Sequence, residues 1–343
     1  MRHESAGEAH PMMSRRAVVL GMLGLPFLAA ACTSGDEAPE AGTGTFPVEV
    51  KHRFGETTVS ERPARIATFG YAAADVCIAL GIAPLGMPGS NATPWYNLRR
   101  VAEETLMPVL YPDDLELALP AIEDLEPDLI FTTGADLTRE QYDRLSDIAP
   151  VVHGTSAGKP SWRETVEQVA RAVGRPDEGA ELIRDTEQSI TASVADYPDL
   201  PGTTFLVVEA FAAAGADLGV YVSGSGPVVT LEEFGMEPAP VPTGLEESDE
   251  LVDEVFGAVG QVRWPRARAE ELRAEVLVLV AERRRAKELA EDLAEDLDPA
   301  QQTVLAPKDE MGAAMIMVSP LSLEWLARNF VPVLAEAAFD VRQ

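Results

Sequence analysis

The stretch RIATFGYAAADVCIALGIAPLGM, residues 65–87, decides the fold class. It opens with a short apolar run at residues 65–68, which is typical of a buried strand. Residues 72–80 follow with apolar side chains at helical spacing, and Gly81 suits the end of that helix. A second apolar run at residues 83–87 completes the unit. A strand, a helix and a strand with short connections predict one unit of a parallel α/β sheet.

The same alternation extends in both directions along the chain. In the first half, the further expected elements are a β-hairpin at 46–59, helices at 119–125 and 138–148, and strands at 128–132 and 150–153. In the second half, they are strands at 203–208, 218–222 and 276–280 and helices at 250–259, 284–297 and 321–339. Strands such as residues 129–131 are apolar throughout, which indicates that helices cover both faces of the sheet.

One long helical stretch separates the two series. The helical pattern is interrupted just before Pro176, a residue suited to a first helical turn. From there it continues to Pro198. We therefore predict an N-terminal α/β lobe at residues 46–173, a linker helix at 174–198 and a C-terminal α/β lobe at 199–343. The predicted fold class is α/β, with two mostly parallel sheets joined by one long α-helix.

The first 31 residues are predicted to be an export signal. Arg15 and Arg16 precede an uncharged apolar stretch that is shorter than the ~18 residues of a spanning helix. Small residues then lead to Cys32, and this ending resembles a bacterial lipobox, although Ala29 stands where leucine is usual. Sec and twin-arginine export both stay open, and an uncleaved signal anchor is the alternative. Residues 32–45 are expected to form a flexible tether.

Composition narrows the function classes. The chain has 27 Lys and Arg against 57 Asp and Glu, a formal charge of −30, which argues against nucleic acid as a partner. Its two cysteines, Cys32 and Cys77, rule out a disulfide framework, and four histidines leave little material for a metal site. Cys77 is expected to be a small buried residue.

Several stretches together resemble one family, the iron-siderophore substrate-binding proteins of ABC transporters. The resemblance is carried by residues 46–52, 54–59, 62–67, 79–86, 122–130, 137–142, 145–151 and 319–323. It implies two Rossmann-like lobes bridged by a rigid helix, with the ligand in a cleft between them. It also implies a lipid-anchored, extracytoplasmic, monomeric receptor that is not an enzyme and has no cofactor. A permease and its ATPase are the implied partners, and the siderophore, not the protein, holds the iron.

Candidate ligand contacts come from loops beyond the carboxyl ends of the expected strands. Aromatic side chains beside arginines can stack on and hydrogen-bond a planar or anionic chelate. The candidates are Tyr71, Trp95, Tyr96, Arg99, Arg100 and Trp162 in the first lobe, and Phe211, Tyr221, Arg283 and Arg284 in the second. Two alternatives stay open: Trp95 packs under a helix, and the arginines face solvent. Ser223, Ser225 and Met311 are weaker candidates. The acidic balance favours a hydroxamate or mixed siderophore over an anionic catecholate.

The resemblance also implies permease docking by one surface glutamate on each lobe. The usual first-lobe position is Pro120 in this chain, and the nearest acidic residues are Glu116 and Glu123. In the second lobe, Glu250 and Glu254 are the candidates.

Two other functions are consistent with parts of the sequence. A cobalamin or haem receptor would use the same fold. A serine hydrolase is suggested by residues 154–158, which match the Gly-x-Ser-x-Gly pattern. That fold needs a histidine after Ser156, and all four histidines precede it.

Overall fold

The computed structural model describes residues 43–89, 94–95, 108–155, 161–210, 217–241, 260–281 and 302–341. The predicted export signal, Cys32 and most of the predicted tether lie outside these residues. The predicted helices at 250–259 and 284–297 also lie outside them. Within the described part, no helix combines the length and the apolar character that crossing a bilayer requires.

Five parallel strands form the first sheet, in the order β5-β4-β3-β6-β7. They are β3 (Ile66–Thr68), β4 (Gly86–Pro88), β5 (Val109–Tyr111), β6 (Leu129–Phe131) and β7 (Val151–Val152). Helix α1 (Tyr71–Ala79) connects β3 to its neighbour β4. The unit predicted from residues 65–87 is thereby confirmed.

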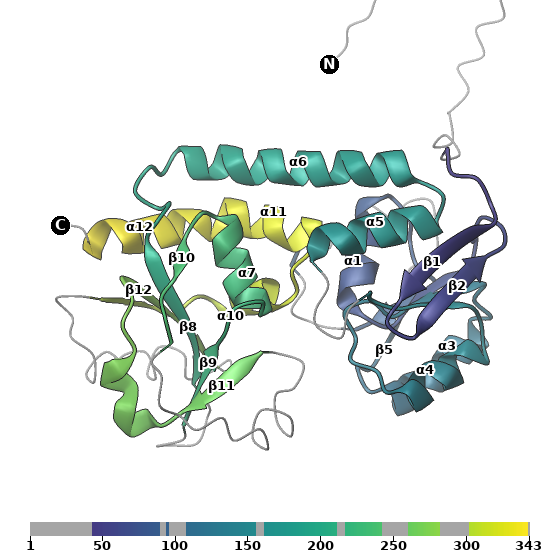
Figure 1. Ribbon diagram of the computed structural model, residues 1–343, viewed down its shortest axis with the longest axis horizontal. Coiled ribbons are helices and arrows are strands. Elements are labelled where there is room, and N and C mark those ends of the chain that lie inside the picture. Colours follow the sequence, from purple (N-terminus) through teal and green to yellow (C-terminus); the bar gives the residue numbers. More distant parts are fainter. Residues whose placement is uncertain are drawn as a thin grey trace, which may run out of the picture. The chain divides into compact units, whose positions relative to one another are not determined.

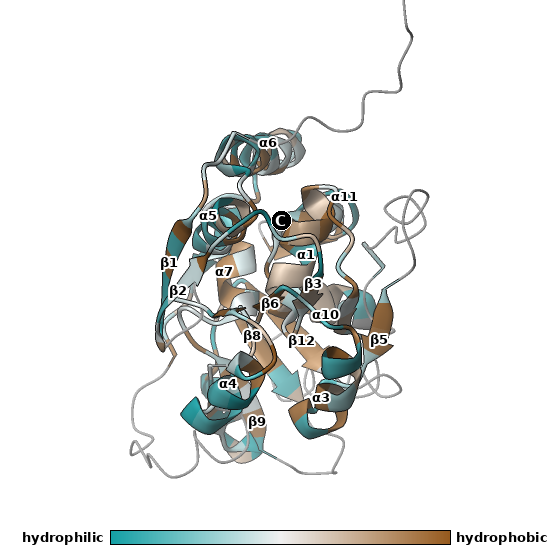
Figure 2. Ribbon diagram, turned by 90° about the vertical axis from the view of Figure 1, so that its right-hand side faces the viewer, coloured by the Kyte–Doolittle hydropathy of each residue, from teal (hydrophilic) through white to brown (hydrophobic). Residues whose placement is uncertain are grey.

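Helices cover both faces of this sheet, and alternate strand residues face them. Ile66 and Leu129 pack in one cluster with α1 and α5 (Trp162–Ala172), whereas Ala67 and Ile130 pack with α3 (Leu115–Asp124) and α4 (Arg139–Ser146). Figure 2 shows the contrast between the hydrophilic α4 and the apolar β5 and β12. Cys77 is fully buried in the first cluster, and burial raises the pKa of its thiol to about 12. It is the small core residue that was predicted.

Side-chain caps set where these helices begin. Thr138 and Gln141 form a capping box at the start of α4, as Ser161 and Glu164 do at α5. Helix α3 begins four residues before the predicted residue 119, because the Asp114 carboxylate accepts a hydrogen bond from the Leu117 N–H at 3.2 Å.

The β-hairpin is confirmed as β1 (Val48–His52) and β2 (Gly55–Val59), which pair antiparallel. The predicted long helix is also present: α6 (Pro176–Ala195) has 20 residues, with Pro176 in its first turn. It packs against α5 and against α11 (Pro320–Asn329), as Figure 1 shows. One helix therefore contacts elements that belong to both predicted lobes.

The second sheet has six strands and is mixed. Its strands are β8 (Thr204–Ala210), β9 (Leu218–Tyr221), β10 (Glu237–Pro238), β11 (Gln261–Trp264), β12 (Val276–Ala281) and β13 (Thr303–Leu305). The strands β10, β8, β12 and β13 pair in parallel, whereas β9 is antiparallel to β8, and β11 is antiparallel to β9. Since β11 is antiparallel to the antiparallel β9, five of the six strands run in one direction, and the expectation of mostly parallel sheets is confirmed in both lobes.

The C-terminal segment departs from the prediction of one helix at 321–339. The described helices of this lobe are α7 (Gly226–Glu233), α10 (Asp309–Ile316), α11 and α12 (Val331–Val341), with a short 3₁₀ turn at Arg266–Glu271. Phe330 separates α11 from α12. Pro332 lacks the N–H that would continue the hydrogen bonding of α11, so the single helix divides there.

The buried His153, which follows β7, contacts both the first sheet and the hairpin. The Nδ1 of His153 lies 2.9 Å from Thr132 Oγ1, and its ring packs 4.9 Å from the ring of Phe54. Burial is the main cause that lowers the pKa of His153 to about 4, and the nearby His52 and Arg53 add to it. His153 is therefore neutral in the folded protein at neutral pH.

This depressed pKa predicts acid sensitivity. Between pH 6.5 and about 4, the unfolded chain binds a proton at His153 that the folded protein does not bind, so the free energy of unfolding falls as the pH falls. Since one pKa unit corresponds to about 1.4 kcal/mol, we expect this residue to account for about 2 kcal/mol of the loss. Urea titrations of the wild type and of His153→Asn at pH 7 and 4.5 measure it. The variant should lose about 2 kcal/mol less across this range, and equal losses in both proteins would contradict the assignment.

Candidate ligand-binding site

The loops after β3 and β6 lie against each other at the carboxyl end of the first sheet. Gly70 has a φ of 154°, and a Cβ there would lie 2.4 Å from the carbonyl oxygen of Thr133, so glycine is required for the close approach. Tyr71 follows directly and is half-buried, and its hydroxyl donates to the Asp113 carboxylate at 2.6 Å. Ligands of α/β sheets bind at this edge, so Tyr71 lies where a contact residue is expected.

Trp95 is buried, with 8% of its surface exposed. Its indole Nε1–H donates to Asp75 Oδ2 at 2.9 Å, and its ring lies 6.2 Å from that of Trp325 in α11. The hydroxyl of Ser319, which caps α11, donates to the same Asp75 oxygen. The placement favours the packing alternative for Trp95, within a contact that joins α1 to α11.

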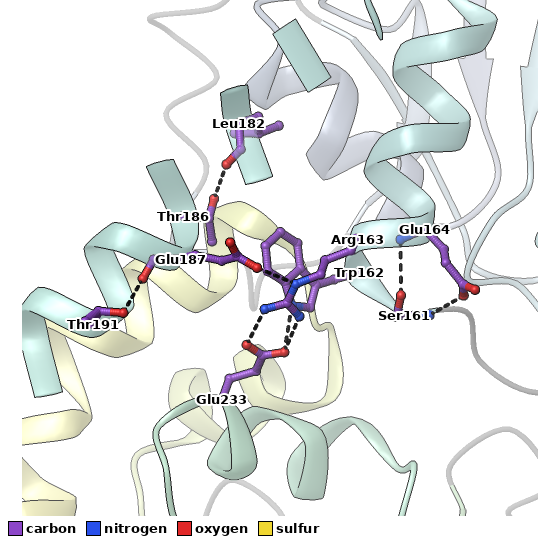
Figure 3. A network of polar contacts seen from close by, with 9 residues as sticks. All are labelled: Ser161, Trp162, Arg163, Glu164, Leu182, Thr186, Glu187, Thr191 and Glu233. Carbon is purple, nitrogen blue, oxygen red and sulfur yellow. Dashed lines mark hydrogen bonds and ion pairs between the residues drawn. The ribbon is translucent and has the colours of Figure 1, made fainter. Parts of the chain in front are cut away.

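Trp162 takes part in a second polar contact between elements of the two lobes (Figure 3). Its indole Nε1–H donates to Glu233 Oε1 of α7 at 3.0 Å, and the ring is 2% exposed. The guanidinium of Arg163 lies 4.3 Å from this ring and binds both oxygens of Glu233, at 2.6 and 3.0 Å. It also donates to Glu187 of α6 at 2.7 Å. Trp162 and Arg163 therefore form a joint, a set of polar contacts, between α5, α6 and α7.

The carboxylates at this joint raise the pKa of Arg163. Its hydrogen bond to Glu233 is the largest of several causes that raise the pKa of Arg163. The guanidinium thus stays charged, and it is satisfied by two carboxylates that come from different elements.

Tyr221 is 2% exposed at the end of β9, and its hydroxyl donates to Glu209 Oε2 at 2.9 Å. Burial, followed by the charge of Glu209, raises the pKa of Tyr221. Gln261 of β11 donates its side-chain amide to the same Glu209 oxygen. Tyr221 therefore reaches the carboxyl end of the second sheet through its hydroxyl, while its ring belongs to the core.

The remaining predicted contacts lie outside the described residues. They are Tyr96, Arg99 and Arg100 of the first lobe, and Phe211, Arg283 and Arg284 of the second. Glu250, Glu254 and Ser156 also lie outside them. In the described part of the chain, no group of three or more His, Cys, Asp or Glu side chains is arranged to hold a metal ion.

The two candidate docking residues lie at opposite ends of α3. Glu116 is in the first turn and forms an ion pair with Arg144 of α4. Glu123 is near the last turn, where it lines a hollow of about 540 Å³ with Glu126, Pro127 and Asp147. Because Pro127 precedes β6, this hollow is at the amino end of the first sheet, away from the edge where ligands bind.

Three residues that organise these contacts were not predicted: Asp75, Glu209 and Glu233. Asp75 is the single charged residue of α1 and is fully buried, which is a signal that the sequence does contain. Glu209 and Glu233 have no such signal, because a half-buried strand and a helix end commonly carry glutamate.

Residues 66–249 match the family described as periplasmic binding protein, which is more than half of the chain. The chain belongs to the periplasmic binding protein family. Membership in a family of binding proteins supports the prediction of a binding protein over the hydrolase alternative.

Individual members of the periplasmic binding protein family give detail. The probable siderophore-binding lipoprotein YfiY of Bacillus subtilis is 27% identical over 212 residues, which cover 61% of this chain and 63% of YfiY. The ferric enterobactin-binding periplasmic protein FepB of Escherichia coli is 30% identical over 151 residues, covering 43% of this chain and 46% of FepB. The chain thus matches less than two thirds of the length of these curated relatives.

A solved structure confirms the fold of this family in the chain. The Streptococcus pneumoniae protein PiaA, in complex with ferrichrome, superposes with a TM-score of 0.68 at 24% sequence identity. The superposition covers 85% of this chain and 99% of PiaA. The predicted architecture of two α/β lobes is that of these binding proteins.

Proposed function

We propose that this protein captures a ferric siderophore outside the cytoplasm and delivers it to the permease of an ABC importer, which a separate ATPase drives. The observation that carries the proposal is the match of residues 66–249 to the periplasmic binding protein family. The two sheets and the long helix α6, which contacts elements of both predicted lobes, support it. The names of YfiY, a probable siderophore-binding lipoprotein, and FepB, a ferric enterobactin-binding protein, support iron chelates as the cargo.

In this proposal, Cys32 carries the lipid anchor, and residues 32–45 tether the folded part to the membrane surface. The leader pattern before Cys32 supports the anchor, as does the lipoprotein name of YfiY. The protein works as a monomer. It needs no cofactor of its own, because the siderophore holds the iron.

The proposed contacts combine one described residue with several others. Tyr71 is at the carboxyl end of the first sheet, and the further contacts are Tyr96, Arg99, Arg100, Phe211, Arg283 and Arg284. For permease docking, Glu116 is better placed than Glu123. Helix α3 follows the carboxyl end of β5, so its first turn lies towards the edge where the ligand binds.

A binding panel tests the function. We expect a ferric trihydroxamate, a ferric tris-catecholate or a ferric carboxylate chelate to quench the tryptophan fluorescence of the purified protein saturably. The expected Kd is about 1 µM or tighter, with the iron-free chelator at least about tenfold weaker. Cobalamin and haem complete the panel. Saturable binding of only cobalamin or haem would identify that ligand, and not a ferric siderophore, as the cargo. Failure of all five ligands to bind would overturn the proposal.

A further inference from the structure

The carboxyl end of β8 carries a charged side chain whose arrangement the proposed function does not yet use. Glu209 is the penultimate residue of β8, and it is half-buried. Along this strand, Phe205 and Val207 pack into the core cluster that also contains residues of α7 and α10. Because strand side chains alternate between faces, Glu209 continues the row of Phe205 and Val207 to the edge where ligands of such sheets bind.

Two neutral donors hold the carboxylate of Glu209. The Tyr221 hydroxyl donates to Oε2 at 2.9 Å, and the amide of Gln261 donates to the same oxygen. Among the described residues, Oε1 receives no hydrogen bond, and no ion pair there involves Glu209. The carboxylate is therefore oriented through one oxygen, and no cation among the described residues forms an ion pair with it.

Two buried polar atoms without partners belong to Gln261, which contacts Glu209, and to Ser225, which lies against the neighbouring Gly260. Gln261, which is 3% exposed, has an Oε1 without a hydrogen-bond partner, and so has the Oγ of Ser225, which is 2% exposed. Gly260, next to Gln261, approaches Ser225 so closely that a Cβ on it would lie 3.2 Å from the Ser225 Cβ. Buried polar atoms without partners are costly, and they are a feature of sites that a ligand completes.

We propose that Glu209 is a specificity-determining residue, whose carboxylate accepts a hydrogen bond from a protonated amine on the siderophore. The same charge weakens the binding of anionic chelates. The inference rests on the proposed function and deepens it by naming the ligand class, a ferric hydroxamate that carries a cationic amine. Tyr221 and Gln261 are positioning residues, since they fix the carboxylate without meeting the ligand.

The test compares two ferric linear trihydroxamates that differ only in their terminal amine, which is free in one and acetylated in the other. A charge-assisted hydrogen bond predicts that the wild type binds the free amine about tenfold more tightly. Glu209→Gln preserves the shape but removes the charge, and the preference should fall to less than about twofold. Tyr221→Phe should give an intermediate preference, because the carboxylate is then held by Gln261 alone among these two donors.

Glu237→Gln is the matched control. Glu237 is exposed on β10, which pairs with the start of β8 at the opposite end of the sheet, so its removal changes the net charge equally. This variant should retain the tenfold preference. Equal binding of both chelates by the wild type, or a full preference in Glu209→Gln, would overturn the inference. If neither trihydroxamate binds while another ferric chelate does, the inference fails and the proposed function stands. If no ferric chelate binds, the proposed function itself fails.

Discussion

Replacing Asp75 with alanine should lower the free energy of unfolding by about 3 kcal/mol. The carboxylate is fully buried and accepts hydrogen bonds from the Trp95 indole, at 2.9 Å, and from the Ser319 hydroxyl. Alanine leaves the indole N–H without this acceptor and opens a small cavity between α1 and α11. Urea unfolding followed by circular dichroism measures the loss.

Asp75→Asn separates charge from hydrogen bonding. The Trp95 indole and the Ser319 hydroxyl both donate to Oδ2, and the asparagine carbonyl can accept from both of them. We expect this variant to lose less than half of what alanine loses. A free energy of unfolding for Asp75→Ala within about 0.5 kcal/mol of the wild type would show that the contact does not stabilise the fold.

Replacing Glu233 with alanine should lower the free energy of unfolding by about 2 kcal/mol. Arg163 stays charged and loses a bidentate partner, and the Trp162 indole loses its acceptor. The expected cost is lower than for a fully buried pair, because the Arg163 side chain is 36% exposed and water can solvate part of it. Thermal and urea unfolding of the variant give the measurement.

The α11 pair of Glu324 and Arg328 supplies the control. It joins two side chains of one helix at 2.9 Å, with Arg328 67% exposed, so Glu324→Ala should change the free energy of unfolding by less than about 0.5 kcal/mol. A loss in Glu233→Ala no larger than in this control would mean that the joint between α5, α6 and α7 adds nothing beyond an exposed ion pair.

The elements that could be predicted from the sequence are those with local signals. Thr138 begins α4 and Pro176 begins α6, because capping and first-turn preferences act within four residues. The strands β5 and β13 were not predicted: they are edge strands with partly exposed residues, in contrast to the equally short but fully buried β3, β4 and β6. Nor was the antiparallel pairing of β9 with β8 and β11, which depends on pairing partners far along the chain.

The candidate site was harder to predict for a related reason. An aromatic residue beside a charged one has the same local pattern whether it faces a ligand or the core. Trp162 contacts Glu233, 71 positions away, and Trp95 contacts Asp75, 20 positions away, and the sequence gives no signal for either pairing. Tyr71 could be placed at the sheet edge because it lies only three residues after the last residue of a predicted strand.

The packing of Trp95 against Trp325 has an optical consequence. Two indoles 6.2 Å apart, with their planes at 52°, are close enough for their excited states to couple. Trp95 lies in the segment between β4 and β5, and Trp325 lies in α11 near the C-terminus. Near-ultraviolet circular dichroism of the unlabelled protein thus contains a signal that depends on how these two distant segments meet. This signal therefore reports on that contact in solution without any attached dye.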